Sequence, residues 1–281
     1  MKKVAILIAT LNRLDFLIRT INYYSSLNSP HPIFIGDASI KSSEKVVLEA
    51  AKGKVELYYF HWVNLKDRET VKKLAEKALE SNISEYCVDQ GDDDFYYLNS
   101  LSLCAEFLSK NSSYATAQGR AIRFELKQSG PYGDMKDIGV YWDENELEGE
   151  TALERLRDIS DNYWVPNFSV HRTKEFIDDF SVGLESVIDR NFGEFANVYT
   201  TSISGKSKFI DCLFLVRQIH DGIDHPKKID WVLGKNWNSS YNELITSVAK
   251  ALSKKDDLDY TLSINEVTSV INKTIAIFLL F

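Results

Sequence analysis

Three consecutive aspartates, Asp92-Asp93-Asp94, stand between an apolar segment at 86–88 and the aromatic residues at 95–97. Adjacent carboxylates repel one another, so a folded chain separates them or supplies a cation. At the end of a buried strand a hard divalent metal is a suitable partner, because Mg²⁺ accepts carboxylate and phosphate oxygens together. The cluster therefore indicates a site for a metal and a phosphate group. A solvated acidic turn is the alternative interpretation.

The composition excludes several classes of protein. The 281 residues suffice for one large domain, and 44% apolar with 26% charged residues is typical of a globular chain. The net charge of -8 argues against nucleic-acid binding. An anionic nucleotide can still bind where a metal and a few basic residues invert the local field. The isolated cysteines Cys87, Cys104 and Cys212 form no CxxC pair, which argues against a disulfide framework or zinc knuckle and favours a cytoplasmic location.

Apolar runs near the two ends are too short for a signal sequence or a membrane span. The run at 4–9 is interrupted at once by polar residues, and we expect it to form a buried first strand. The run at 275–281 is shorter than a bilayer-spanning helix. It is expected to dock on the domain; pairing with another chain and peripheral contact with a membrane are the alternatives. The oligomeric state is left open.

The elements that position the aspartates alternate between strand and helix patterns. A continuous apolar run predicts a buried strand over 4–9, further strands are predicted over 32–37, 55–60 and 85–88, and an extended segment over 114–124. Apolar residues at helical spacing predict helices over 14–24, 44–51, 71–79 and 101–108. In the first of these helices Arg19 is one of the polar residues between the apolar positions. This order predicts an α/β protein with an open, mixed but mostly parallel sheet flanked by helices.

Ligands of such sheets bind at the carboxyl ends of the strands. Asp37 and the aspartate cluster each follow a predicted strand, and Thr10 to Arg13 follow the first one. The three loops should therefore open onto one edge, which favours a binding site over a solvated turn. Because side chains alternate along an extended segment, Asp93 is expected to point away from its two neighbours.

The second half of the chain is less regular. Thr151 and Glu154 form a predicted capping box that begins a helix over 151–159. A short strand or loop is expected over 164–172, a strand over 214–220, and helices from about Tyr241 onward. Trp164 and His171 are candidates to line an acceptor pocket, since aromatic faces pack against sugar rings, or they belong to the core.

The order of the motifs resembles the GT-A glycosyltransferases, in particular the family-2-like group. The segment Val4-Ala5-Ile6-Leu7-Ile8-Ala9-Thr10-Leu11-Asn12-Arg13 is similar to the opening strand and P-T-x-N-R turn of that group, with Ala9 where proline is usual. Ile35-Gly36-Asp37-Ala38-Ser39 resembles its V-D-x-S motif, and Gly91-Asp92-Asp93-Asp94-Phe95 resembles the metal-binding DxD element. The resemblance covers the chain up to Phe124 and fades beyond it.

The resemblance implies a GT-A, Rossmann-like domain over 1–240, followed by a helical C-terminal segment over 241–281. Residues 1–124 would bind the nucleotide-sugar and residues 125–240 the acceptor. The implied enzyme uses Mn²⁺ or Mg²⁺ and moves a sugar from a nucleoside diphosphate donor to an acceptor hydroxyl, with inversion. The usual setting of the group implies a glycan or glycolipid acceptor in the synthesis of surface polysaccharide.

Roles of single residues follow from the same resemblance. Donor contacts are implied for Thr10, Asn12, Arg13, Asp37, Asp92 and Asp93. The implied metal ligands are Asp94, Asp92 and His220, with His225 close enough to be confused with His220. For Asp37 the alternative is a simple strand-end turn, and for Arg13 it is a helix cap or a surface ion pair.

An inverting transferase also needs a general base that takes the proton from the acceptor hydroxyl, and a carboxylate is usual there. The resemblance places it beyond the DxD element at the beginning of a helix. Glu194 is favoured because a glycine precedes it, with Asp189 second and Glu185 as a further candidate. A solvated carboxylate is the alternative for each of them.

Other functions fit the sequence less well. A sugar-phosphate nucleotidyltransferase needs a glycine-rich basic loop after the first strand, and Thr10 to Arg13 contain no glycine. A HAD-type phosphatase needs an Asp-x-Asp at its first strand, and an EF-hand needs a glycine and a terminal glutamate that the segment from Asp89 lacks. The non-enzymatic alternative is a nucleotide-sugar-binding or scaffold protein on a degenerate GT-A fold.

Overall fold

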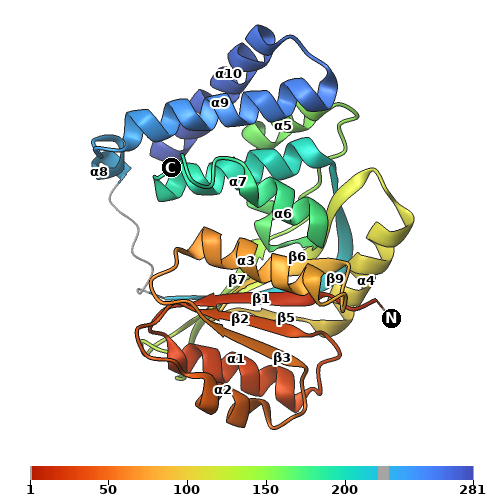
Figure 1. The fold of residues 1–281 in the computed structure, drawn as a ribbon, viewed down its shortest axis with the longest axis vertical. Coiled ribbons are helices and arrows are strands. Elements are labelled where there is room, and N and C mark those ends of the chain that lie inside the picture. The colour runs from red at the N-terminus through yellow and green to blue at the C-terminus, as the bar shows by residue number, and fades with distance from the viewer. Residues whose placement is uncertain (1, 221–227, 281) are drawn as a thin grey trace.

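A sheet crosses the molecule and separates two layers of helices (Figure 1). The computed structural model describes residues 2–220 and 228–280, so His225 lies outside the described residues. Within them the strand order is β3-β2-β1-β4-β8-β6-β9-β5, with β7 paired to β6. The strands are β1 (Ala5–Thr10), β2 (Ile33–Asp37), β3 (Leu57–His61), β4 (Tyr86–Gly91), β5 (Phe95–Tyr96), β6 (Tyr114–Leu126), β7 (Met135–Trp142), β8 (Val170–Arg172) and β9 (Lys206–Ile219).

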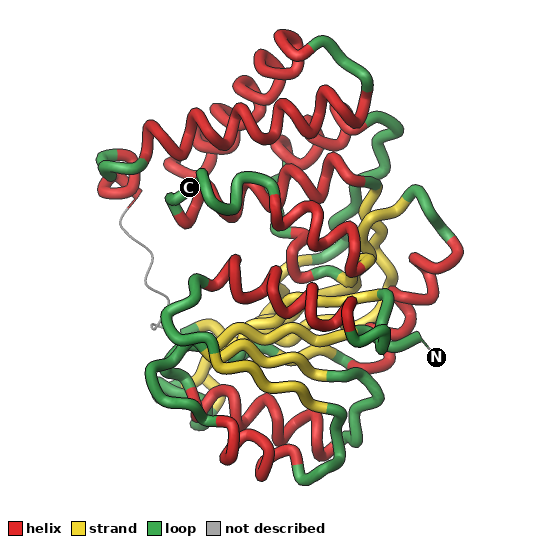
Figure 2. The backbone as a smooth tube through the Cα atoms, in the orientation of Figure 1, coloured by secondary structure: helices red, strands yellow, loops and turns green. Residues whose placement is uncertain are grey.

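The helices lie on both faces of this sheet and in a cap beyond one face, as the red segments of Figure 2 show. A short 3₁₀ helix, Pro166–Phe168, precedes β8. The α-helices are α1 (Leu14–Ser26), α2 (Glu44–Ala51), α3 (Asp67–Glu80), α4 (Leu98–Lys110), α5 (Ala152–Asp161), α6 (Thr173–Ser181), α7 (Arg190–Ser204), α8 (Lys228–Val232), α9 (Trp237–Asp256) and α10 (Tyr260–Leu280).

The first half of the chain forms the elements that its hydrophobic pattern predicts. The strands β3, β2, β1 and β4 are neighbours and run parallel. Their register pairs Thr10 with Asp37 and Ala9 with Gly91, so the loops that follow β1, β2 and β4 leave the sheet at one edge. The expected convergence of the three loops is confirmed.

The second half turns the sheet into a mixed one. The short strand β8 runs antiparallel to both β4 and β6, while β6 and β9 are parallel. Antiparallel pairing of β5 with β9 places Phe95 opposite Val216. Because β5 directly follows the three aspartates, this pairing brings the end of β9 next to them. The predicted mixed α/β sheet is confirmed, with antiparallel pairs concentrated in this half.

Three hydrophobic clusters hold the layers together. One lies between the sheet and helices α1, α2 and α4, and includes the buried side chains of Ile6, Ile8, Ile21 and Leu101. A second lies between the other face of the sheet and helices α3 and α6. The third fills the helical cap, where α5, α7, α9 and α10 pack on one another. Burial of this apolar surface is the main favourable contribution to folding.

The helical C-terminal segment shares its core with α5 and α7. Its first long helix, α9, begins at Trp237, so the expected division at 240–241 falls inside that helix, and the one at 124–125 falls inside β6. On α10, Ile275 is buried and the ring of Phe278 contacts the rings of Phe195 and Trp231. The apolar end therefore docks on the domain over these residues, as expected. Among the described residues, no helix combines the length and the apolar character that crossing a bilayer requires.

Candidate functional site

A pocket of about 410 Å³ opens at the edge where β1 and β2 end. Three segments line it: the turn after β1, the start of α1, and the loop after β2. The lining residues are Thr10, Asn12, Arg13, Leu14, Leu17, Asp37, Ser39, Ile40, Lys41 and Ser43. The turn after β1 needs a left-handed residue, Asn12 (φ 56°), whose backbone N–H donates to Ser39 Oγ at 2.8 Å. This bond ties the two loops together at the pocket.

Asp37 lines the pocket, and two hydrogen bonds hold its carboxylate in place. One oxygen accepts the backbone N–H of Ser39 at 2.8 Å, and the other accepts the hydroxyl of Tyr59. Burial and this bond raise the pKa of Tyr59 to about 12. A carboxylate oxygen can accept more than one hydrogen bond, so Asp37 can still receive an N–H or O–H group from a ligand. Tyr59, on the neighbouring strand, was not predicted as a site residue.

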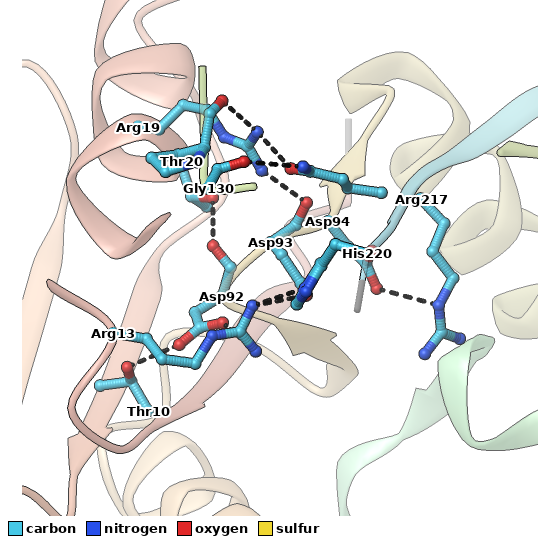
Figure 3. A network of polar contacts seen from close by, with 12 residues as sticks. Thr10, Arg13, Arg19, Thr20, Asp92, Asp93, Asp94, Gly130, Arg217 and His220 are labelled. Carbon is cyan, nitrogen blue, oxygen red and sulfur yellow. Dashed lines mark hydrogen bonds and ion pairs between the residues drawn. The ribbon is translucent and has the colours of Figure 1, made fainter. Parts of the chain in front are cut away.

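The three aspartates lie on what we call the aspartate turn, residues 91–94. The backbone N–H of Asp94 donates to the carbonyl of Gly91 at 3.1 Å, which closes a β-turn. The chain is therefore not extended here, and the expected alternation of side chains is wrong. Asp92 and Asp93 face the same arginine, whereas Asp94 faces a different one (Figure 3).

Arg13 bridges the first two aspartates. Its Nη1 lies 3.1 Å from Asp92 Oδ1, and its Nη2 lies 2.7 Å from Asp93 Oδ2. The hydroxyl of Thr10 donates to Asp92 Oδ2 at 2.7 Å. His220, just beyond β9, lies with Nε2 2.7 Å from Asp93 Oδ2 and stacks on the ring of Phe16. The structure thus brings together Thr10, Arg13 and His220, which are far apart in the sequence.

Arg217, which the sequence analysis did not single out, is the partner of Asp94. Its Nε lies 3.8 Å from Asp94 Oδ2, and its guanidinium lies over the rings of Tyr141 and Phe168, at 5.0 and 4.7 Å from their centroids. A charged residue inside the apolar strand pattern of 214–220 was the available signal. The other carboxylate oxygen of Asp94, Oδ1, is buried and has no hydrogen-bond partner among the described residues.

The three carboxyl groups differ in acidity. Burial raises the pKa of Asp94 to about 8, with the charge of Arg217 opposing the shift. Burial also raises the pKa of Asp92 to about 6, against the charge of Arg13. For Asp93 the same effect is outweighed by hydrogen bonds and charges of Arg13 and His220, which lower its pKa. Near neutral pH the turn therefore carries a firmly charged Asp93 beside an Asp94 that is held close to its protonated form.

A hard divalent cation fits part of this arrangement. The nearest carboxylate oxygens of Asp93 and Asp94 lie 2.6 and 3.1 Å from the point where a Cβ on residue 91 would stand, so both lean over Gly91. The orphaned Oδ1 of Asp94 is a further potential ligand atom. Among the described residues, no group of three or more His, Cys, Asp or Glu side chains is arranged to hold a metal. A cation here would need phosphate and water oxygens as additional ligands, which is usual for Mg²⁺.

The two candidate bases occupy different positions on α7. Asp189 is the N-cap: its Oδ1 accepts the backbone N–H of Phe192 at 3.0 Å and the indole N–H of Trp231 at 2.9 Å. Glu194 lies within the first turns of α7 rather than at its beginning, is exposed, and accepts the hydroxyl of Tyr163 at 3.1 Å. Glu185, between α6 and α7, is also exposed.

Tyr141 lies beside Arg217, the partner of Asp94. Burial raises the pKa of Tyr141, and the negative charges of Asp94 and Glu194 add to that shift. Tyr141 is therefore within electrostatic reach of both carboxylates, and it also accepts a hydrogen bond from Arg217 at 3.1 Å.

The residues expected to line an acceptor pocket belong to the interior. His171 is 1% exposed, its Nε2 lies 3.0 Å from the carbonyl of Pro166, and its ring packs on Phe176. Burial lowers its pKa to about 4, which keeps the imidazole neutral. Trp164 is 9% exposed and packs in the core of the helical cap. Both residues therefore belong to the core, which was the alternative interpretation, and we do not retain His171 as an acceptor contact.

Comparison with known proteins supports the fold. No protein-family model matches the chain, and no curated protein sequence matches it. Solved structures do: those of residues 1–349 of Staphylococcus aureus TarS share 13% identity and cover 98% of this chain. The complex with UDP-GlcNAc has a TM-score of 0.59 over 73% of that chain, the complex with UDP 0.54 over 72%, and a further structure of residues 1–349 0.56 over 72%. The chain therefore has the GT-A glycosyltransferase fold, as predicted.

Proposed function

We propose that this protein is a metal-dependent glycosyltransferase that moves a sugar from a nucleoside diphosphate donor to an acceptor hydroxyl. The observation that carries the proposal is the continuity of the site. Asp37 and Arg13 both line the pocket, and the same Arg13 binds the aspartate turn. A carboxylate suited to nucleoside N–H or O–H groups is thus connected to a cationic and acidic centre suited to a diphosphate. Structures of the same fold were solved with UDP-GlcNAc and UDP.

In this proposal the base or ribose of the donor contacts Asp37, and Arg13 moves from the aspartates to the diphosphate. Asp93 and Asp94 would hold the cation with phosphate and water oxygens as its other ligands, so Asp93 replaces Asp92 in the expected ligand set and His220 keeps its contact with Asp93 Oδ2. The reason is that a carboxylate oxygen of Asp93 lies beside one of Asp94 over Gly91, whereas Asp92 Oδ2 accepts the hydroxyl of Thr10. A bound Mn²⁺ or Mg²⁺ would neutralise charge on the departing nucleoside diphosphate and make it a better leaving group.

Glu194 is the proposed general base. Its carboxylate would accept the proton of the acceptor hydroxyl while the hydroxyl oxygen forms a bond to C1 of the sugar. The bond between C1 and the diphosphate oxygen breaks, and attack from the face opposite to the leaving group inverts the anomeric centre. Asp189 is the weaker candidate, because its carboxylate caps α7 and binds Trp231. A surface glycan or glycolipid is the proposed acceptor class, and the usual setting of the fold is its support.

Thermal unfolding with UDP, GDP, CDP and ADP, each with Mn²⁺ and with EDTA, tests the proposal without knowledge of the acceptor. A ligand that binds only the folded state raises Tm by mass action. We expect one diphosphate to raise Tm in Mn²⁺ and to raise it much less in EDTA. A nucleotide-sugar with the same base, such as UDP-GlcNAc for UDP, should then be slowly hydrolysed. Binding without any turnover would favour the scaffold alternative. No shift with any diphosphate would contradict both functions.

A further inference from the structure

The backbone of the aspartate turn is held by side chains, and two of these come from consecutive residues of α1. The carbonyl of Asp92 accepts the hydroxyl of Thr20 at 2.8 Å, and the carbonyl of Asp93 accepts Arg19 Nη2 at 2.8 Å (Figure 3). The carbonyl of Asp94 accepts Gln90 Nε2 at 3.0 Å. The backbone carbonyls of residues 92–94 therefore each accept a hydrogen bond from a side chain.

Arg19 is fixed by contacts on several sides. Its Nη1 donates to the carbonyl of Pro131 at 2.6 Å and to Gln218 Oε1 at 2.5 Å. Its guanidinium also lies near the rings of Phe16 and Phe95, at 5.4 and 4.8 Å from the ring centroids. Arg19 therefore binds backbone carbonyls and a side-chain amide, and it does not line the pocket. Arg13, by contrast, binds carboxylates and lines the pocket.

The same guanidinium joins three parts of the chain that are distant in sequence. It touches the aspartate turn, the loop that contains Pro131, and the end of β9 through Gln218, whose own amide donates to the carbonyl of Gly130 at 2.9 Å. The end of β9 also carries Arg217 and leads into His220. Arg19 therefore connects the aspartate turn to the segment 217–220 at the end of β9, which contacts Asp93 and Asp94.

We propose that Arg19 and Thr20 are positioning residues that hold the aspartate turn in the shape in which it receives a cation and a diphosphate. This inference rests on the proposed function. A cation at Asp93 and Asp94 requires two carboxylates to stay close together in their charged form, so an unsupported turn would rearrange to separate them. Hydrogen bonds to the backbone carbonyls oppose that rearrangement without occupying any carboxylate oxygen. Preorganisation of this kind lowers the cost of assembling the site when the ligand binds.

The test compares Thr20→Val, which removes the hydroxyl donor, with Thr20→Ser, which keeps it. Arg19→Gln is the second variant, and Arg157→Gln, an exposed arginine of α5, is its control. Thermal unfolding measures the Mn²⁺ concentration that gives the half-maximal shift at a fixed, saturating UDP concentration. We expect this concentration to rise about ten-fold in Thr20→Val and at least as much in Arg19→Gln, the size of a lost hydrogen bond to a charged or buried group. Thr20→Ser and Arg157→Gln should match the wild type.

Uridine binding in EDTA is the second readout, because the carboxylate of Asp37 is held by Ser39 and Tyr59 and not by the turn. We expect all variants to bind uridine like the wild type. Equal Mn²⁺ requirements in the wild type, Thr20→Val and Arg19→Gln would overturn the inference, as would a parallel loss of uridine binding, which indicates general damage to packing. If Arg19→Gln does not fold, the comparison of Thr20→Val with Thr20→Ser tests the inference by itself. A wild type without any Mn²⁺-dependent shift would overturn the proposed function itself, and this inference with it.

Discussion

The guanidinium of Arg217 lies 3.8 Å from the carboxylate of Asp94, measured from Nε to Oδ2, and the rings of Tyr141 and Phe168 hold it there. The pairing joins the end of β9 to the aspartate turn. It is too long for a direct hydrogen bond, so the charge of Asp94 is only partly compensated. This explains how a buried carboxyl beside an arginine still has its pKa raised to about 8.

The first prediction concerns the stability of the ligand-free protein as a function of pH. A carboxyl whose pKa is raised on folding binds its proton more tightly in the folded state, so ionisation destabilises the fold. The cost begins above the unfolded pKa near 4 and is complete above about pH 8. Asp94→Asn removes this cost. We expect its advantage in free energy of unfolding to grow between pH 6 and 8, by at most about 1.4 kcal/mol per pH unit, and to level off above 8.

Chemical denaturation of the wild type and Asp94→Asn at pH 6, 7, 8 and 9 measures this difference. Asp211→Asn is the matched control, because Asp211 is an exposed partner of Arg120. Its stability relative to the wild type should not vary over this range. A difference for Asp94→Asn that is flat from pH 6 to 9 would contradict the raised pKa. The same variant should lose the Mn²⁺-dependent part of UDP binding.

The second prediction concerns Asp37. Asp37→Asn keeps an oxygen for the backbone N–H of Ser39 and removes the negative charge. We expect nucleoside and nucleoside diphosphate binding to weaken about ten-fold or more, with and without Mn²⁺, because a hydrogen bond to a charged group is lost. Calorimetric titration with uridine and UDP measures it. Tyr59→Phe, which removes the other partner but keeps the carboxylate, should change affinity much less; equal losses in both variants would indicate a structural strand-end turn.

The third prediction separates the two candidate bases. Glu194→Gln should keep donor affinity and reduce transfer about 10²-fold to 10⁴-fold, the usual contribution of a general base. Tyr163→Phe is its control, since it removes the hydroxyl that donates to Glu194 and keeps the carboxylate. Asp189→Ala should instead cost about 1 kcal/mol of stability, because it removes the N-cap of α7. Full activity of Glu194→Gln, with loss in a folded Asp189→Asn, would move the base to Asp189.

The fourth prediction uses a glycine. A methyl group on Gly91 would stand 2.6 Å from a carboxylate oxygen of Asp93 and 3.1 Å from one of Asp94. Those side-chain ends can move, so Gly91→Ala should fold, but the carboxylates would no longer lean over residue 91. We expect Mn²⁺-dependent UDP binding to fall about ten-fold or more, while uridine binding in EDTA is kept. Thermal shift assays measure both.

Gly139→Ala on β7 is the control for this prediction, because its nearest neighbour atom would lie 3.6 Å from the new Cβ, an ordinary contact. It should bind UDP and Mn²⁺ like the wild type. If Gly91→Ala also matched the wild type, the cation would have to bind away from Asp93 and Asp94.

Local patterns were sufficient to predict most elements of the first half. Apolar runs indicate strands buried on both faces, and the structure contains such strands at β1 and β2, with the half-buried β3 and the largely buried β4 where strands were predicted. The capping box of Thr151 and Glu154 likewise begins α5 as expected. The rule that parallel strands open onto one edge then placed Thr10, Asp37 and the aspartates together without knowledge of any contact.

Contacts between distant segments decided the rest. Arg19 occupies a polar position of the amphipathic helix α1, which by itself predicts a solvent-facing side chain. Tertiary packing instead places it against the carbonyls of Asp93 and Pro131. Asp93 is in a turn rather than an extended segment, so its carboxylate meets Arg13 and His220. Sequence determined which residues could do chemistry and at which edge they lie, because both follow from local periodicity. Only the tertiary structure decided which carboxylate faces which cation, because that depends on how β5 pairs with β9 and on how α1 packs against the turn.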